Sequence, residues 1–111
     1  MNKKIKDIIS KQINEEFYSA YLYLAFSARL EKMGFKGAAN WMKVQYQEEV
    51  DHAVGFVRFL AERGEEPEFD AIAKPELADS ISLSEIFAAG LKHEGHDFAS
   101  LITASASATA P

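Results

Sequence analysis

Apolar positions in the first third of the chain follow the period of an α-helix. They recur at helical spacing at Ile5, Ile9, Ile13, Phe17, Leu24 and Leu30. Gly34 follows the last of them, and glycine is the residue that most often ends a helix because it tolerates a left-handed backbone. The pattern predicts one long helix over residues 5–33.

A second helical pattern begins two or three residues later. It includes Ala38, Met42, Gln45, Glu49, His52, Phe56 and Phe59, and Gly64 follows it. We predict a helix over residues 36–63, so that each helix has roughly 28 residues and is ~42 Å long. A connection this short forces the two helices into an antiparallel hairpin.

The segment 65–81 contains two prolines and no sustained period, which is typical of a connection. Extended at ~3.4 Å per residue, it is long enough to follow a whole helix, so the next helix can run parallel to the second. Ser82 and Glu85 have the spacing of a capping box, and a third helix over about residues 83–98 is expected. The predicted fold class is therefore all-α.

The last residues differ in composition from the rest. The stretch FASLITASASATAP, residues 98–111, carries no charge and is dominated by Ala, Ser and Thr. Such a low-complexity sequence has little amphipathic reason to pack. We expect one helical domain over residues 1–97, followed by a disordered tail.

Composition narrows the functional classes. A chain of 111 residues with 48% apolar content corresponds to one domain with a modest core. The absence of cysteine excludes thiolate metal sites and cysteine nucleophiles. A net charge of −5 argues against a nucleic-acid partner and fits cationic ligands better. No stretch has the length of a membrane span or the character of a signal peptide, so we expect a soluble, cytoplasmic protein.

Two carboxylates fall on faces that should be buried. Glu49 and His52 are three residues apart on one helix face, which they share with Phe56 and Phe59, and Glu16 lies on the apolar stripe of the first helix. A lone ionised carboxylate in an apolar layer costs several kcal/mol unless it is paired, protonated or bound to a metal. No Lys or Arg is evident on these stripes, and a divalent cation would resolve the problem.

The alternative interpretation is that Glu16, Glu49 and His52 have no role in metal binding. A Glu-x-x-His pair arises often by chance, and most such pairs are solvated. Carboxylates with one imidazole suit iron or manganese, although the set does not itself select iron over manganese or zinc. Helical di-iron bundles combine one Glu from a helix with Glu-x-x-His from another, and then repeat that set. This chain shows one half of such a set.

Other candidates have competing interpretations. Glu94 in the third helix is a further possible ligand, or part of a solvated face. Glu48 is turned about 100° around the helix from Glu49 and is expected to be solvated. Tyr23 is more often a core or interface residue than a redox relay.

The run NEEFYSAYLYLAFSARLEKMGFKGAANWMKVQYQEEVDHAVGFVRFLAERG, with the long connection and LKHE after it, resembles the non-haem ferritins of bacteria and archaea. The resemblance spans roughly residues 5–94. It implies that Glu16, Glu49 and His52 bind a first iron, that Glu49 bridges, and that Glu94 binds a second iron. It further implies that Tyr23 lies next to the centre and that Glu48 belongs to an accessory iron site.

Proteins similar to these ferritins oxidise Fe(II) with dioxygen or peroxide and store the ferric mineral inside a shell of subunits. This sequence departs from the pattern after Glu94, where it turns into GHDFASLITASASATAP, as if the ferritin sequence were truncated or changed in frame. The expected fold is then an incomplete four-helix bundle that self-association completes. The alternatives are a catalytically silent helical assembly domain and a manganese- or zinc-binding protein.

Overall fold

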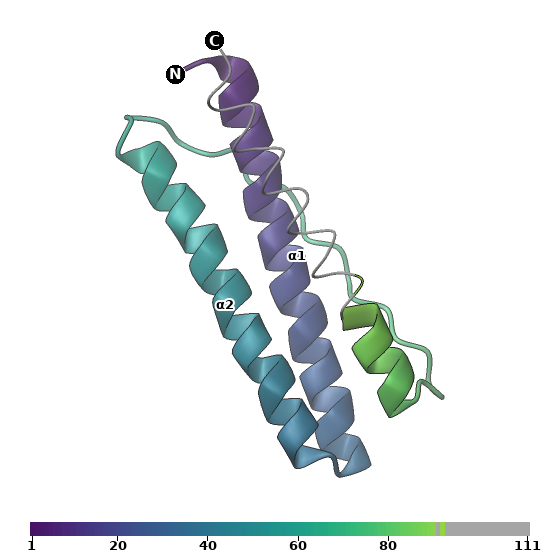
Figure 1. Cartoon of the computed structure of the whole chain (residues 1–111). Coiled ribbons are helices and arrows are strands. Elements are labelled where there is room, and N and C mark those ends of the chain that lie inside the picture. The colour runs from purple at the N-terminus through teal and green to yellow at the C-terminus, as the bar shows by residue number, and fades with distance from the viewer. Residues whose placement is uncertain (91, 93–111) are drawn as a thin grey trace.

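The computed structural model describes residues 1–90 and 92. Two long helices, α1 (Lys3–Met33) and α2 (Lys36–Ala61), lie side by side and antiparallel (Figure 1). A third, shorter helical segment spans residues 83–90. The described residues contain no strand, so the predicted all-α class and the predicted hairpin are confirmed.

Both ends of α1 are explained by its sequence. Asn2 caps the first turn, because its side-chain oxygen accepts a hydrogen bond from the Lys4 backbone N–H at 2.7 Å. At the other end Gly34 has φ 88°, and the next N–H, of Phe35, donates to the Leu30 carbonyl at 2.9 Å. This is a Schellman-type end, which requires a residue that tolerates positive φ. The predicted glycine stop is confirmed, and the helix begins two residues earlier than expected.

α2 ends slightly before its predicted limit. The helix proper closes at Ala61, and residues 62–64 form a turn that ends at Gly64, with φ 72°. The Glu65 N–H donates to the Leu60 carbonyl at 2.9 Å across this turn. The second glycine therefore redirects the chain into the connection, as the sequence predicts, although the last two predicted residues are not helical.

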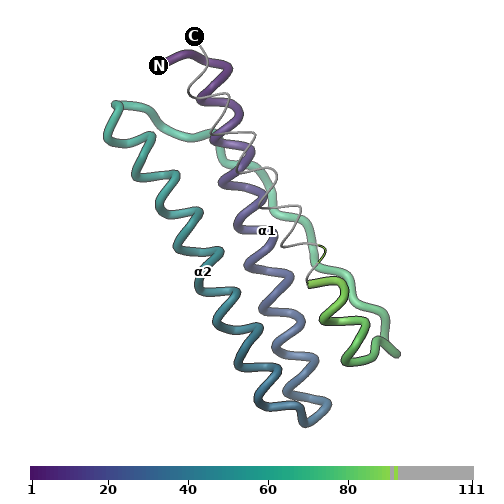
Figure 2. Tube along the Cα trace, in the orientation of Figure 1, coloured from purple at the N-terminus to yellow at the C-terminus, as the bar shows by residue number. Residues whose placement is uncertain are grey.

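The connection after α2 returns along α1, as Figure 2 shows. Its start is fixed by the Glu68 N–H, which donates to Ser10 Oγ at 3.1 Å, and its end by Arg29 Nη1, which donates to the Ala78 carbonyl at 2.6 Å. The contacts progress from residue 10 to residue 29 of α1, so the connection runs in the same direction as α1. The expectation that it travels the length of a helix is confirmed.

The capping box at the third helix is present. Ser82 Oγ accepts from the Glu85 N–H at 3.2 Å, and Glu85 Oε1 accepts from the Ser82 N–H at 3.2 Å. The segment then returns toward the middle of α1, where the Tyr23 hydroxyl donates a hydrogen bond to the Gly90 carbonyl at 3.2 Å. It therefore runs parallel to α2. The predicted continuation to residue 98 and the predicted tail lie outside the described residues.

The apolar core is divided into two clusters along the hairpin. The first cluster lies near the α1–α2 connection and contains Leu22, Tyr23, Phe26, Leu30, Ala39, Met42 and Ile86. The second lies toward the opposite end and contains Ile9, Ile13, Ala53 and Leu60. Glu16 of α1 and Glu49 of α2 fall between the clusters in both helices. The fold thus interrupts its core at the level of the two carboxylates.

Part of α1 is apolar on its outer side as well. Ala20 is buried, whereas Tyr21 and Leu24 are 47% and 41% exposed. One neighbouring helix therefore does not cover the middle of α1. Within the described residues, no helix is both long enough and apolar enough to cross a membrane.

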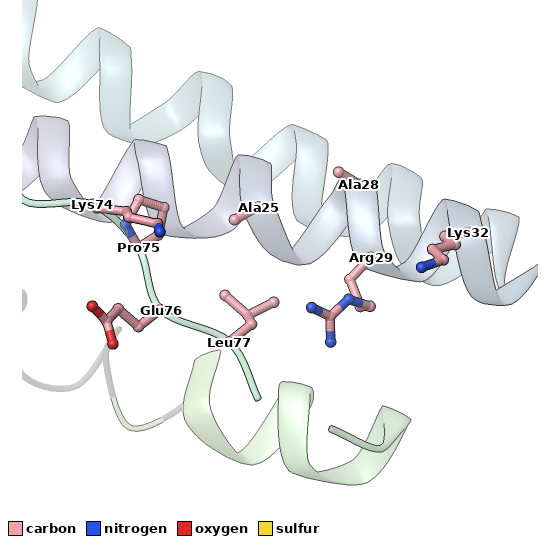
Figure 3. Close-up of a pocket in the computed structure, with 8 residues that line it drawn as sticks. All are labelled: Ala25, Ala28, Arg29, Lys32, Lys74, Pro75, Glu76 and Leu77. Carbon is pink, nitrogen blue, oxygen red and sulfur yellow. The ribbon is translucent and has the colours of Figure 1, made fainter. Parts of the chain in front are cut away.

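A basic pocket of about 500 Å³ lies between α1 and the connection (Figure 3). It is lined by the charged residues Arg29, Lys32, Lys74 and Glu76 and by Ala25, Ala28, Pro75 and Leu77. Figure 3 shows the Arg29 side chain directed from α1 toward the connection. None of the predicted metal ligands lines this pocket.

Core packing near the hairpin turn should dominate stability. Leu30 is fully buried, so Leu30→Ala should lower the free energy of unfolding by about 2–5 kcal/mol through lost burial and a residual cavity. Met33→Ala, on the same helix but at a side chain 38% exposed, should cost less than about 1 kcal/mol. Urea unfolding followed by circular dichroism measures both, and equal losses would contradict the described core.

Candidate metal centre

Two helices bring the candidate ligands together from positions far apart in the sequence. Glu16 comes from the middle of α1 and Glu49 from the middle of α2, and their exposed fractions are 1% and 2%. The expectation that both carboxylates point inward is therefore confirmed. Their burial is set by the antiparallel packing of α1 on α2 and by the apolar clusters on either side.

His52 completes a compact group. One ligand atom from each of Glu16, Glu49 and His52 lies within 4.8 Å of the others. His52 Nδ1 is 3.4 Å from Glu16 Oε2 and 3.8 Å from Glu49 Oε2. Two carboxylate oxygens therefore converge on one imidazole nitrogen, which is the donor set that sequence spacing predicts.

The surroundings of Glu16 fit a bound cation. Its Oε1 accepts a hydrogen bond from Gln12 Nε2 at 3.1 Å. Its Oε2 is buried and accepts no hydrogen bond from the described residues, and it faces the His52 imidazole. A buried carboxylate oxygen without a hydrogen-bond donor is costly, and a metal ion at this point would compensate it. Oxygen donors with one imidazole suit Fe(II) or Mn(II).

His52 is more exposed than its predicted position on a buried helix face implies. Its side chain is 50% exposed, and Phe56 and Phe59, on the same side of α2, are only half-buried. On this face of α2, Glu49 lies in the core, whereas His52, three residues later, lies at the surface. The three-residue group is therefore enclosed by the hairpin on one side and open to the surface on the other.

The other predicted site residues are not part of this three-residue group or lie outside the described residues. Glu48 is exposed and outside the three-residue group, in agreement with the solvated interpretation. Tyr23 is buried in the first apolar cluster, and its hydroxyl donates to Gly90. Glu94 lies outside the described residues, so its role as second-iron ligand stays a prediction.

Gln12 is a contributor that the sequence analysis missed. It is 4% exposed and lies one helical turn before Glu16, the residue to which it donates. The signal available in the sequence was the four-residue spacing, which places the two side chains on one face. Spacing alone is weak, because many such pairs on helices are solvated.

Comparison with known proteins decides the family. A model of the ferritin-like domain matches residues 6–108 of this chain. The chain belongs to the ferritin family. The matched range continues past residue 94, where the resemblance based on the ligand motifs ends.

Curated ferritins are similar to this chain over most of its length. A bacterial non-heme ferritin of Bacteroides fragilis is 35% identical over 101 residues, covering 86% of this chain and 60% of that protein. One from Staphylococcus saprophyticus is 35% identical over 94 residues, covering 85% and 56%. The chain thus spans less than two thirds of the length of these relatives.

Solved structures in the family confirm the architecture. An open-pore ferritin from the hyperthermophilic archaeon Archaeoglobus fulgidus superposes with a TM-score of 0.87 and 34% identity, over 94% of this chain and 64% of that one. A variant of PmFTN soaked in iron gives a TM-score of 0.91 at 27% identity, over 97% and 69%. The hairpin, connection and third segment therefore form an incomplete ferritin four-helix bundle.

The buried carboxylate should reduce the stability of the metal-free protein. Glu16→Gln keeps the shape of the side chain and removes its charge, so it should raise the free energy of unfolding without metal by about 1–3 kcal/mol. Urea unfolding in chelator measures the change. Glu48→Gln, which makes the same change at an exposed carboxylate of α2, is the matched control and should change it by less than about 0.5 kcal/mol. A destabilised Glu16→Gln variant would contradict the claim that the buried charge of Glu16 is costly when no metal is bound.

Proposed function

We propose that this chain binds Fe(II) at Glu16, Glu49 and His52 and takes part in iron oxidation and storage. The observation that carries the proposal is the convergence of two buried carboxylates and one imidazole within 4.8 Å, in a member of the ferritin family. Fe(II) is the substrate, and dioxygen or peroxide is the oxidant that ferritin chemistry implies.

Each residue has a distinct role in this proposal. Glu16, Glu49 and His52 bind the first iron, with the two carboxylate oxygens 3.4 and 3.8 Å from His52 Nδ1. By the family resemblance, Glu49 also bridges toward a second iron. Glu94 would bind that second iron, Tyr23 would lie beside the centre, and Glu48 would belong to an accessory site. These last three assignments rest on the family resemblance.

Oxidation by dioxygen needs more than one of these positions. Two-metal sites hold their ions about 3.5–4 Å apart, so that both share the reacting oxygen species. Glu16, Glu49 and His52 supply one full position and part of another. A second copy would contribute the same three residues and so provide two Glu and two Glu-x-x-His sets, the pattern of di-iron helical bundles.

Two features support completion of the centre by another copy. The half-exposed His52 places one side of the centre at the protein surface, where a second set of ligands can approach. Tyr21 and Leu24 also leave apolar area on α1 that association would cover. In this proposal the chain self-associates, and oxidation depends on that association.

Metal affinity tests the ligand assignment. Glu49→Ala should weaken Co(II) or anaerobic Fe(II) binding most, because a bridging carboxylate serves two ions, and His52→Ala should weaken it by at least about tenfold. Asp51→Ala is the matched control, because it removes an exposed carboxylate beside His52 that is outside the group. Isothermal titration calorimetry gives affinity and stoichiometry together. Unchanged affinity in Glu49→Ala would overturn the site, and no binding by the natural chain would favour a silent assembly domain.

Oxidation rate should depend on protein concentration. Stopped-flow absorbance at a fixed iron-to-protein ratio should show a fast phase whose amplitude rises as the chain associates, with association followed by sedimentation at the same concentrations. The physical reason is that each pair of irons needs ligands from two copies. A fast phase of full amplitude in a demonstrably monomeric sample would contradict the shared centre.

A further inference from the structure

Gln12 is a buried polar side chain with one described partner, and that partner is a candidate metal ligand. Its Nε2 donates to Glu16 Oε1 at 3.1 Å, and the residue is 4% exposed. On either side of it along α1, Ile9 and Ile13 belong to the second apolar cluster. Burying an amide among apolar side chains costs free energy unless the amide forms a hydrogen bond.

This hydrogen bond gives the two oxygens of Glu16 different tasks. Oε1 is directed at the Gln12 amide, whereas Oε2 faces His52 Nδ1 at 3.4 Å. A carboxylate free to rotate could present either oxygen, or both, to a metal ion. Because the Gln12 amide is hydrogen-bonded to Oε1, only Oε2 is oriented toward the group that Glu16 forms with Glu49 and His52.

We infer that Gln12 is a positioning residue that keeps Glu16 a single-oxygen ligand and thereby sets which cations the centre accepts. Large cations such as Ca²⁺ take six to eight oxygen ligands and often bind both oxygens of a carboxylate. Transition ions such as Fe(II) and Co(II) suit a mixed site with an imidazole and need no such two-oxygen contact. Holding Oε1 away therefore disfavours Ca²⁺ selectively. The inference rests on the proposed function, since it assumes that the group binds a metal.

A merely structural role for Gln12 makes a different prediction. If the Gln12 amide only fills space and satisfies a hydrogen bond, its loss lowers the stability of the fold and weakens the binding of all cations alike. If it orients Glu16, its loss changes the preference between cations. The ratio of Co(II) to Ca²⁺ affinity therefore separates the two roles.

The test uses Gln12→Met, which is unbranched, of similar length and a good helix former, but has no N–H to donate. We expect the Co(II) dissociation constant to rise by about tenfold, as is typical when a partner of a metal ligand is removed. The Ca²⁺ constant should rise less or fall, so the Co(II) to Ca²⁺ preference drops. The visible spectrum of bound Co(II) should also change, because Glu16 gains freedom to bind through both oxygens.

Three controls make the result specific. Gln12→Leu removes the same donor with a different shape, and circular dichroism confirms that each variant is folded at the titration temperature. Ser27→Ala removes another buried hydrogen bond of α1, to the Ala39 carbonyl at 2.8 Å, and should leave both metal constants unchanged. In a Glu16→Ala background, Gln12→Met should have little further effect, since it acts through the Glu16 carboxylate.

The outcomes distinguish this inference from the proposed function. A natural chain that binds Co(II), with a lower Co(II) to Ca²⁺ ratio in both Gln12 variants, supports it. Natural binding with an unchanged ratio in both variants overturns the inference and leaves the proposed function intact. Failure of the natural chain to bind Co(II) saturably overturns both.

Discussion

Burial of two carboxylates between α1 and α2 is the constraint on which the rest of this structure depends. Glu16 and Glu49 are almost completely enclosed, yet they interrupt the apolar packing of the hairpin. Apolar burial on both sides offsets the cost of desolvating them. The hairpin thus carries two apolar clusters, one on each side of a polar layer.

The connection and the third segment follow from the same arrangement. By returning along α1, the connection starts the third segment near the hairpin turn, where Ile86 enters the first cluster. The segment then brings the Gly90 carbonyl to the Tyr23 hydroxyl. A Cβ added at Gly90 would lie 3.5 Å from Met42 and 3.6 Å from Tyr23, in ordinary van der Waals contact, so the third segment packs directly on this cluster. The third segment thus packs against the cluster that flanks the centre and leaves His52 half-exposed.

Local features of the fold were predictable from the sequence, and features that depend on what covers a surface were not. Gly34 and the Ser82–Glu85 capping box act within a few residues, so their spacing is sufficient to predict the helix ends. The inward direction of Glu16 and Glu49 followed from helical periodicity. His52 shares that periodicity but is half-exposed, because its exposure depends on a neighbour that the hairpin does not provide. The Gln12–Glu16 hydrogen bond needs burial as well as spacing, and burial is a tertiary property.

In the proposed function, the buried carboxylates Glu16 and Glu49 hold iron between the two helices. Anomalous diffraction at the iron edge, from crystals loaded anaerobically with Fe(II), tests it most directly. The account predicts the strongest anomalous peak between Glu16, Glu49 and His52. Iron found only at exposed carboxylates such as Glu48, with none between the helices, would contradict it.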